Sequence, residues 1–392
     1  MKYDKNHVFA ACGRLRTVMD ENILLGKDAF SSFGDVVPFT GRALGRKDLS
    51  NADILLVRSV TRVNADLLAD TPVKFVASAT IGVDHVDTEY LSGRSIGFAY
   101  APGSNADSVA EYVVAALLTL SGSLGFNTAQ KTLGIIGVGN IGGRVLEHAQ
   151  ALGMRVIKCD PPKKRLTNCE SYRPLDELLE EADIITLHVP LVSNGDDRTV
   201  GLVDRFFIER MKCGAILINT SRGSVVDESA LLACRDRLGA LVLDVWNSEP
   251  AINIDLLRCA DIATPHIAGY SFDGKLHGTE AIYGAACSYF GINRHWTPPA
   301  ELCSEIVDTI DAADCGKTDP VTTAVLHAYP IKRDDANLRQ ICYSTPDRRA
   351  VVFDELRKTY PKRREFPHFE VNTAKLCSAT IEKLRALRFK TV

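Results

Sequence analysis

The sequence contains no run of about 18 apolar residues, the length that a helix needs to cross a bilayer. Its N-terminus also lacks the long apolar stretch of a secretory signal peptide. Eleven cysteines are present, but no two form a CxxC pair and no Cys/His cluster has zinc-finger spacing. These absences argue against a membrane protein, a zinc module and a secreted disulfide scaffold. We therefore expect reduced thiols, no metal and a cytoplasmic location.

Neither sign of charge is in large excess, because the formal net charge of the 392 residues is −3. A general nucleic-acid-binding protein would carry a strong positive balance, so we expect neither nucleic acid nor membrane as a partner. A chain of this length exceeds what one hydrophobic core normally holds. Two or three domains are therefore expected.

Short apolar runs alternate with turn residues and helical stretches along most of the chain. This alternation predicts an α/β protein with parallel sheets. Residues 108–120 are apolar on most sides, which predicts a long buried helix. Strands are predicted at residues 54–57, 74–79, 95–99, 133–136, 155–159, 184–188, 215–219, 239–244 and 262–264.

A glycine-rich turn follows the predicted strand that begins at Leu133, within the sequence LGIIGVGNIGGR. Gly137 allows a tight turn, Gly139 lets backbone amides approach a pyrophosphate, and Gly142 allows close packing of helix and strand. The N-terminus of the following helix offers free N–H groups to the anion. The predicted cofactor-binding residues of this turn are Gly137, Gly139, Asn140, Ile141 and Gly142.

An acidic residue, Asp160, ends the next predicted strand, 18 residues after Gly142. A carboxylate at this place accepts hydrogen bonds from the adenosine ribose and repels a 2′-phosphate, so the expected cofactor is NAD rather than NADP. The cations at residues 163–165 follow directly and would tolerate a 2′-phosphate, which leaves the strictness of that preference open.

Three later strands are each followed by an ionisable side chain. Arg222 lies in an Arg-Gly segment, Glu249 in a Glu-Pro segment and His266 in the segment PHIAG. Oxidation of a hydroxy acid needs a base for the hydroxyl proton, and a neutral histidine serves near pH 7. A neighbouring carboxylate fixes the tautomer of that histidine, and an arginine holds the substrate carboxylate. We therefore predict that these three residues are catalytic.

With these motifs in this order, residues from about 15 to 295 resemble the D-isomer-specific 2-hydroxyacid dehydrogenases. The resemblance implies a Rossmann NAD-binding domain and a flavodoxin-like substrate domain. It also implies catalysis by Arg222 and Glu249, with proton transfer by His266. The implied NAD contacts are Asp160, Val189, Asp244 and Gly269, and the implied substrate contacts are Ser59, Thr80 and Tyr270.

Further stretches narrow the resemblance to a branch of that family whose substrate is a small phosphorylated hydroxy acid. They are residues 57–61, 79–87, 101–105, 266–270 with 274–275, 331–335 and 355–364. The last two lie in a charged tail that resembles a small α/β dimerisation domain, which implies a homodimer. Arg58 is the candidate cation for the substrate phosphate.

The implied domains are a substrate-binding domain over residues 1–107, completed by about 272–295, an NAD-binding domain over 108–271 and a dimerisation domain over 296–392. Two alternatives stay open. One is another dehydrogenase of the same family, acting on phosphoglycerate, glyoxylate or hydroxypyruvate, although the tail argues against it. The other is a corepressor-like protein that binds NAD without catalysis. No basic DNA-binding stretch supports that second alternative.

Overall fold

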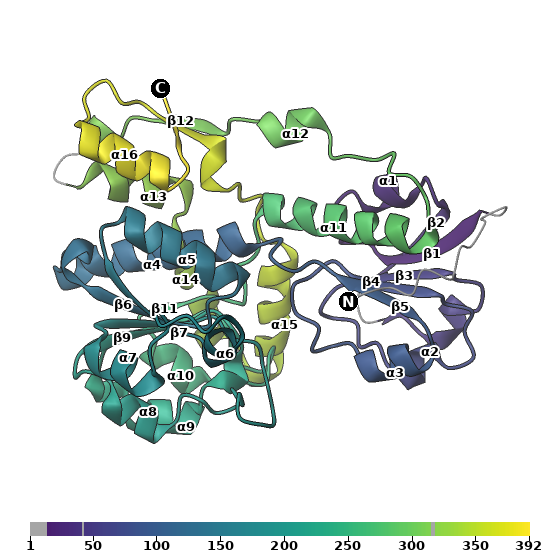
Figure 1. Cartoon of the computed structure of the whole chain (residues 1–392), viewed down its shortest axis with the longest axis horizontal. Coiled ribbons are helices and arrows are strands. Elements are labelled where there is room, and N and C mark those ends of the chain that lie inside the picture. The colour runs from purple at the N-terminus through teal and green to yellow at the C-terminus, as the bar shows by residue number, and fades with distance from the viewer. Residues whose placement is uncertain (1–13, 41–42, 315–317) are drawn as a thin grey trace. The chain divides into compact units, whose positions relative to one another are not determined.

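The computed structural model describes residues 14–40, 43–314 and 318–392 (Figure 1). Residues 1–13, on which the expectation of no signal peptide rests, lie outside the described residues. The chain divides into two compact units, of which one comprises residues 1–105 and 272–305 and the other residues 106–271 and 306–392. The C-terminal segment thus clusters with the predicted NAD-binding domain.

The first unit contains a five-stranded parallel sheet in the order β2-β1-β3-β4-β5. This is the flavodoxin-like order, as the family resemblance implied. Two of its strands are buried along their whole length, because parallel strands covered on both faces consist of continuous apolar runs. The strands are β1 (Leu15–Asp20), β2 (Gly34–Phe39), β3 (Ile54–Val57), β4 (Phe75–Ser78) and β5 (Gly97–Tyr100).

Helices cover both faces of this sheet (Figure 1). On one face, α1 (Gly26–Phe30) and the long α11 (Phe272–Phe290) bury a cluster of aromatic rings that includes Phe30, Phe75 and Tyr283. The short helices α2 (Ala65–Leu68) and α3 (Thr88–Gly93) pack on the other face. The chain then continues through α12 (Ala300–Ser304).

The second unit contains a six-stranded parallel sheet in the order β11-β10-β9-β8-β6-β7. Tyr172 adds a single parallel bridge to Lys158 of β7, so the third strand of a Rossmann sheet is reduced here to one residue. The strands are β6 (Thr132–Ile136), β7 (Arg155–Cys159), β8 (Ile184–Leu187), β9 (Ala215–Asn219), β10 (Leu238–Leu243) and β11 (Ile262–Ala263).

Two hydrophobic cores flank this sheet. The predicted buried helix is α4 (Ala106–Leu124), which packs against α5 (Asn140–Ala151) on one face. The opposite face carries the helices that connect the later strands (Figure 1). The helices on that face are α7 (Leu175–Glu181), α8 (Arg205–Arg210), α9 (Glu228–Ala233) and α10 (Ile254–Cys259). The short helix α6 (Pro161–Thr167) directly follows β7.

The C-terminal segment is a small α/β region, as predicted. Its three-stranded parallel sheet has the order β12-β13-β14. Its helices contribute to both cores of the second unit, through residues such as Val325 on one face and Phe353 on the other. The elements are β12 (Asp308–Ile310), α13 (Pro320–Ala328), α14 (Ile331–Arg339), α15 (Pro346–Lys358), β13 (Phe369–Val371), α16 (Ser378–Ala386) and β14 (Lys390–Thr391).

Candidate active site

The glycine-rich turn joins β6 to the N-terminus of α5, where the structure places Asn140 and Ile141 in the first turn. Gly137 has a φ of +84°, which favours glycine. A Cβ on Gly142 would lie 2.0 Å from the carbonyl oxygen of Gly137, so only glycine allows this packing. A Cβ on Gly139 would meet no described atom within 4 Å. The turn therefore leaves open space at the glycine where a pyrophosphate would approach the backbone.

Asp160 directly follows β7 and is hydrogen-bonded to the glycine-rich turn. Its carboxylate accepts hydrogen bonds from the backbone N–H of Val138 at 2.8 Å and from that of Lys163 at 3.0 Å. Lys163 in turn donates to the carbonyl of Val138. Val189, at the end of β8, lies against the turn, because a Cβ on Gly137 would be 2.9 Å from its Cγ1. The residues present thus fit a dinucleotide at the switch point between β6 and β8.

Replacing Gly139 by alanine tests this fit, and we expect a loss of about 10- to 100-fold in NAD affinity, because the added methyl group would occupy the pyrophosphate space. The melting temperature of the ligand-free protein should stay the same, since the methyl meets no described atom. Gly143→Ala is the matched control, since its Cβ also has no neighbour within 4 Å. Titration with NADH, followed by fluorescence, measures the effect, and equal affinities in the two variants would contradict the assignment.

Arg222 follows β9 and is half-buried. Its Nη1 donates to the carbonyl oxygen of Ser221 at 2.8 Å. The next residue, Gly223, lies directly against the loop after β10, because a Cβ there would be 2.0 Å from the carbonyl carbon of Trp246. The Arg-Gly segment and the loop that carries Glu249 are therefore in contact.

Glu249 and His266 form a pair. Nδ1 of His266 lies 2.8 Å from Oε2 of Glu249, and both side chains are part-buried. Oε1 of Glu249 accepts a hydrogen bond from the backbone N–H of Trp246 at 2.9 Å. Burial would raise the pKa of Glu249, but the charge and hydrogen bond of His266, with smaller contributions from Trp246 and Arg357, hold that pKa below its ordinary value. The carboxylate is thus ionised and fixes Nδ1 as the donor, which leaves Nε2 to accept a proton.

The backbone at His266 is held in an uncommon conformation, with a φ of +57°. Asp244 fixes it, because its carbonyl accepts from the N–H of His266 at 2.7 Å and its carboxylate accepts from those of Ile267 and Ala268. Asp244 is fully buried, and burial raises the pKa of its carboxyl. Gly269, predicted to contact NAD, follows directly in this loop.

The predicted substrate contacts lie in both units. Ser59 and Thr80 follow β3 and β4 of the first unit. Ser59 is exposed, while the Thr80 hydroxyl is 2.7 Å from Ser78 Oγ and also donates to the carbonyl of Gly82 at 3.2 Å. Tyr270 belongs to the second unit, where its hydroxyl accepts a hydrogen bond from Arg357 at 2.9 Å.

Sequence reasoning assigned no role to Arg357 or Arg363, although both lie in the tail stretch that carries the resemblance. Arg363 donates to the carbonyl of Ala268 at 3.1 Å and so supports the loop after His266. Neither contact has a local sequence signal, because the partners are 87 and 95 residues apart along the chain.

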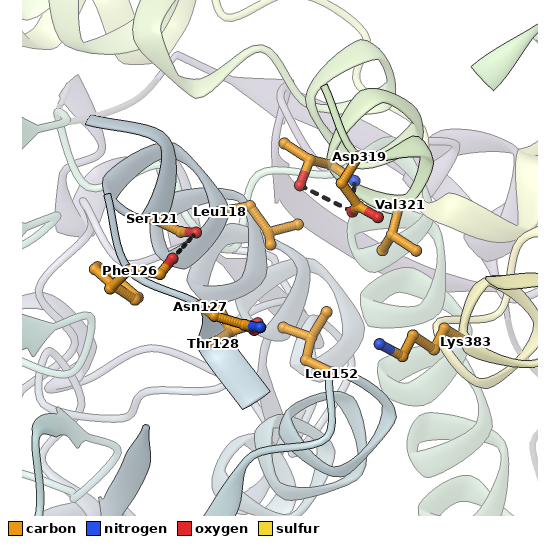
Figure 2. A pocket seen from close by; sticks show the side chains of 10 residues that line it. Leu118, Ser121, Phe126, Asn127, Thr128, Leu152, Asp319, Val321 and Lys383 are labelled. Atoms are coloured by element: carbon orange, nitrogen blue, oxygen red, sulfur yellow. Dashed lines mark hydrogen bonds between the residues drawn. The ribbon is translucent and has the colours of Figure 1, made fainter. Parts of the chain in front are cut away.

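A separate pocket of about 350 Å³ lies at the C-terminal end of α4, where Lys383 of α16 extends toward it (Figure 2). Leu118 and Val321 are among its lining residues, and none of the predicted site residues borders it. No helix in the described part of the chain is long and apolar enough to cross a membrane. The described ranges also contain no cluster of three or more His, Cys, Asp or Glu arranged to hold a metal.

Comparison with known proteins agrees with this geometry. Residues 113–268 match the family model of the D-isomer specific 2-hydroxyacid dehydrogenase NAD binding domain, and residues 304–387 match a domain described as of unknown function. Erythronate-4-phosphate dehydrogenase of Salinibacter ruber is 45% identical over 370 residues, covering 91% of this chain and 94% of the relative. That of Salmonella arizonae is 42% identical over 385 residues, covering 96% and 99%.

Among solved structures, D-lactate dehydrogenase of Aquifex aeolicus, in complex with NAD and lactic acid, has a TM-score of 0.59 and 26% identity. The match covers 70% of this chain and 95% of that structure. Three findings identify the family of the chain. They are the glycine-rich turn, the Glu249–His266 pair and the similarity to relatives over nearly their full length. The chain belongs to the erythronate-4-phosphate dehydrogenases, within the NAD-dependent D-isomer specific 2-hydroxyacid dehydrogenase family.

Proposed function

We propose that the protein oxidises 4-phospho-D-erythronate to (R)-3-hydroxy-2-oxo-4-phosphooxybutanoate with NAD, a step of vitamin B6 biosynthesis. The observation that carries this proposal is the Glu249–His266 pair, with Nδ1 and Oε2 2.8 Å apart, in a chain 45% identical to a named erythronate-4-phosphate dehydrogenase. The pair provides the base that oxidation of a secondary alcohol requires.

The roles of the residues follow from the chemistry. The guanidinium of Arg222 holds the substrate carboxylate with two parallel hydrogen bonds. Nε2 of His266 takes the proton of the C2 hydroxyl, and Glu249 stabilises the imidazolium that forms, because its carboxylate faces Nδ1. Bound NAD supplies the acceptor for the hydride that leaves C2. One proton and one hydride thus leave the substrate, and C2 becomes a carbonyl carbon.

Hydroxyl groups and strand-end loops supply the proposed contacts to the two ligands. Ser59, Thr80 and Tyr270 offer hydroxyl groups to the substrate. The glycine-rich turn and the loop residues at the strand ends hold the dinucleotide. The NAD contacts proposed outside the turn are Asp160, Val189, Asp244 and Gly269.

The test is NADH formation at about 340 nm with 4-phospho-D-erythronate, beside 3-phosphoglycerate and glycerate, and with a 2-oxo acid present to reoxidise tightly held NADH. Turnover with 4-phosphoerythronate far above that with the others supports the proposal. Turnover only with 3-phosphoglycerate or glycerate would agree with the dehydrogenase family but would reject 4-phospho-D-erythronate as the substrate. NAD binding without turnover on any of them points to a corepressor-like role.

We also propose that the protein is a cytoplasmic homodimer that pairs through residues 296–392, with residues 1–107 and about 272–295 as the substrate domain and 108–271 as the NAD domain. The cytoplasmic location is supported by the nine cysteines in the described residues, which are all free. The molar mass of the intact chain, measured by light scattering, tests the dimer. A monomeric intact chain would contradict it.

A further inference from the structure

Arg357 lies in the last turn of α15, within the segment that the NAD-binding family model does not cover. Its Nη2 donates to the Tyr270 hydroxyl at 2.9 Å, and its guanidinium carbon is 5.5 Å from the centre of the Tyr270 ring. Its charge is also close enough to Glu249 to contribute to the lowered pKa of that carboxyl. A tail residue therefore stands beside two of the predicted site residues.

This guanidinium has no carboxylate partner among the described residues. Other arginines of the second unit do have one, as the buried Arg363–Glu111 pair and the part-buried Arg339–Asp335 and Arg235–Asp261 pairs show. The Nε of Arg357 is buried and makes no hydrogen bond to any residue that the structure describes. A desolvated cation with unused donors is costly unless an anion binds it.

We propose that Arg357, together with the hydroxyl of Tyr270, binds the phosphate group of the substrate. This inference rests on the proposed function, because it assigns the second anionic group of the same substrate. Arg222 already serves the carboxylate at the reacting end. The guanidinium forms two parallel hydrogen bonds to phosphate oxygens, and the Tyr270 hydroxyl donates a third when Arg357 turns to the ligand.

The placement explains why the phosphate-binding cation is absent from the common family motifs. Residues 113–268, which match the NAD binding domain of the family, contain the proposed catalytic residues Arg222, Glu249 and His266. A terminal phosphate is an additional feature of this substrate, and Arg357 belongs to the additional segment at residues 304–387.

The experiment compares Arg357→Met and Arg357→Lys with wild type on 4-phospho-D-erythronate and on D-erythronate, which lacks the phosphate. Loss of charged hydrogen bonds predicts that Arg357→Met lowers kcat/KM for the phosphorylated substrate roughly 10- to 100-fold. The value for D-erythronate should change by less than about 3-fold, and Arg357→Lys should retain part of the preference. The control is Arg348→Met, an exposed arginine on the same helix.

A second measurement does not depend on turnover. Inorganic phosphate is titrated calorimetrically into NAD-loaded wild type and Arg357→Met, after thermal unfolding has shown that both are folded. Weaker phosphate binding by the variant is expected, and unchanged binding would overturn the proposal.

Two further results would also overturn it. One is an equal loss on both substrates with a shifted pH profile of kcat/KM, because Arg357 would then act through Glu249 and His266. The other is a loss of phosphate preference in Arg58→Ala alone. Wild type that binds phosphate through Arg357 but does not oxidise 4-phosphoerythronate would reject the proposed function and keep the phosphate site.

Discussion

Replacing His266 by alanine is expected to lower kcat about 100- to 10,000-fold, with NAD affinity within about 2-fold of wild type. In the proposed mechanism the imidazole is the base, and its Nδ1 lies 2.8 Å from Oε2 of Glu249. Steady-state rates with the substrate, together with NADH titration, measure both quantities. A variant with kcat within 10-fold of wild type would remove His266 from proton transfer.

Two further variants test whether the loss of kcat is specific to the pair of His266 and Glu249. Glu249→Gln keeps the size of the side chain but removes its charge, so the imidazolium loses its stabilising partner and kcat should also fall. His277→Ala changes an exposed histidine on α11 and should leave kcat unchanged. If the double variant of His266 and Glu249 is no worse than His266→Ala alone, the two residues act as a unit.

Replacing Arg363 by methionine is expected to lower the free energy of unfolding by about 3–5 kcal/mol. Its Nη1 lies 3.1 Å from Oε2 of Glu111, and the two side chains are only 4% and 2% exposed. Burial and the charge of Glu365 raise the pKa of Glu111, which Arg363 opposes. Without the arginine, this carboxyl would be buried unpaired. Urea unfolding followed by circular dichroism measures the loss.

The double variant Arg363→Met with Glu111→Gln separates the ion pair from simple packing. Removing both charges should recover part of the lost stability, because no charge then stays unpaired in the core. A loss under about 1 kcal/mol in the single variant would show that the pair contributes little. A fall in kcat is also expected, since Arg363 donates a hydrogen bond to the carbonyl of Ala268, in the loop that carries His266.

Most strands were predictable because their signal is local. Apolar runs such as residues 54–57 and 215–219 are buried on both faces, and the observed strands match them to the residue. The first two strands were not predicted, because LRTVMD and GDVVPF interrupt their apolar residues with polar ones. Tyr172, the remnant of a third Rossmann strand, makes a single bridge that leaves no pattern.

In the candidate site, too, some contacts were predictable from the sequence motifs, whereas contacts between residues far apart in the sequence were not. The order of the motifs after parallel strands predicted that Glu249 and His266 would meet, and the structure brings them within hydrogen-bonding distance. The role of Asp244 in holding the His266 loop depends on backbone N–H groups more than 20 residues away, which no spacing reveals. The same holds for Arg357, because its contact with Tyr270 depends on how residues 306–392 pack within the second unit.

The membership of residues 306–392 in the nucleotide-binding unit has a thermodynamic consequence. A ligand that binds only the folded unit stabilises every segment that unfolds with it. At a free NAD concentration of about 100 times Kd, this linkage is worth about 2.7 kcal/mol. The dinucleotide therefore protects the tail from transient opening and proteolysis although the glycine-rich turn lies more than 150 residues before it. We therefore expect the supply of NAD to influence how long residues 306–392 stay folded.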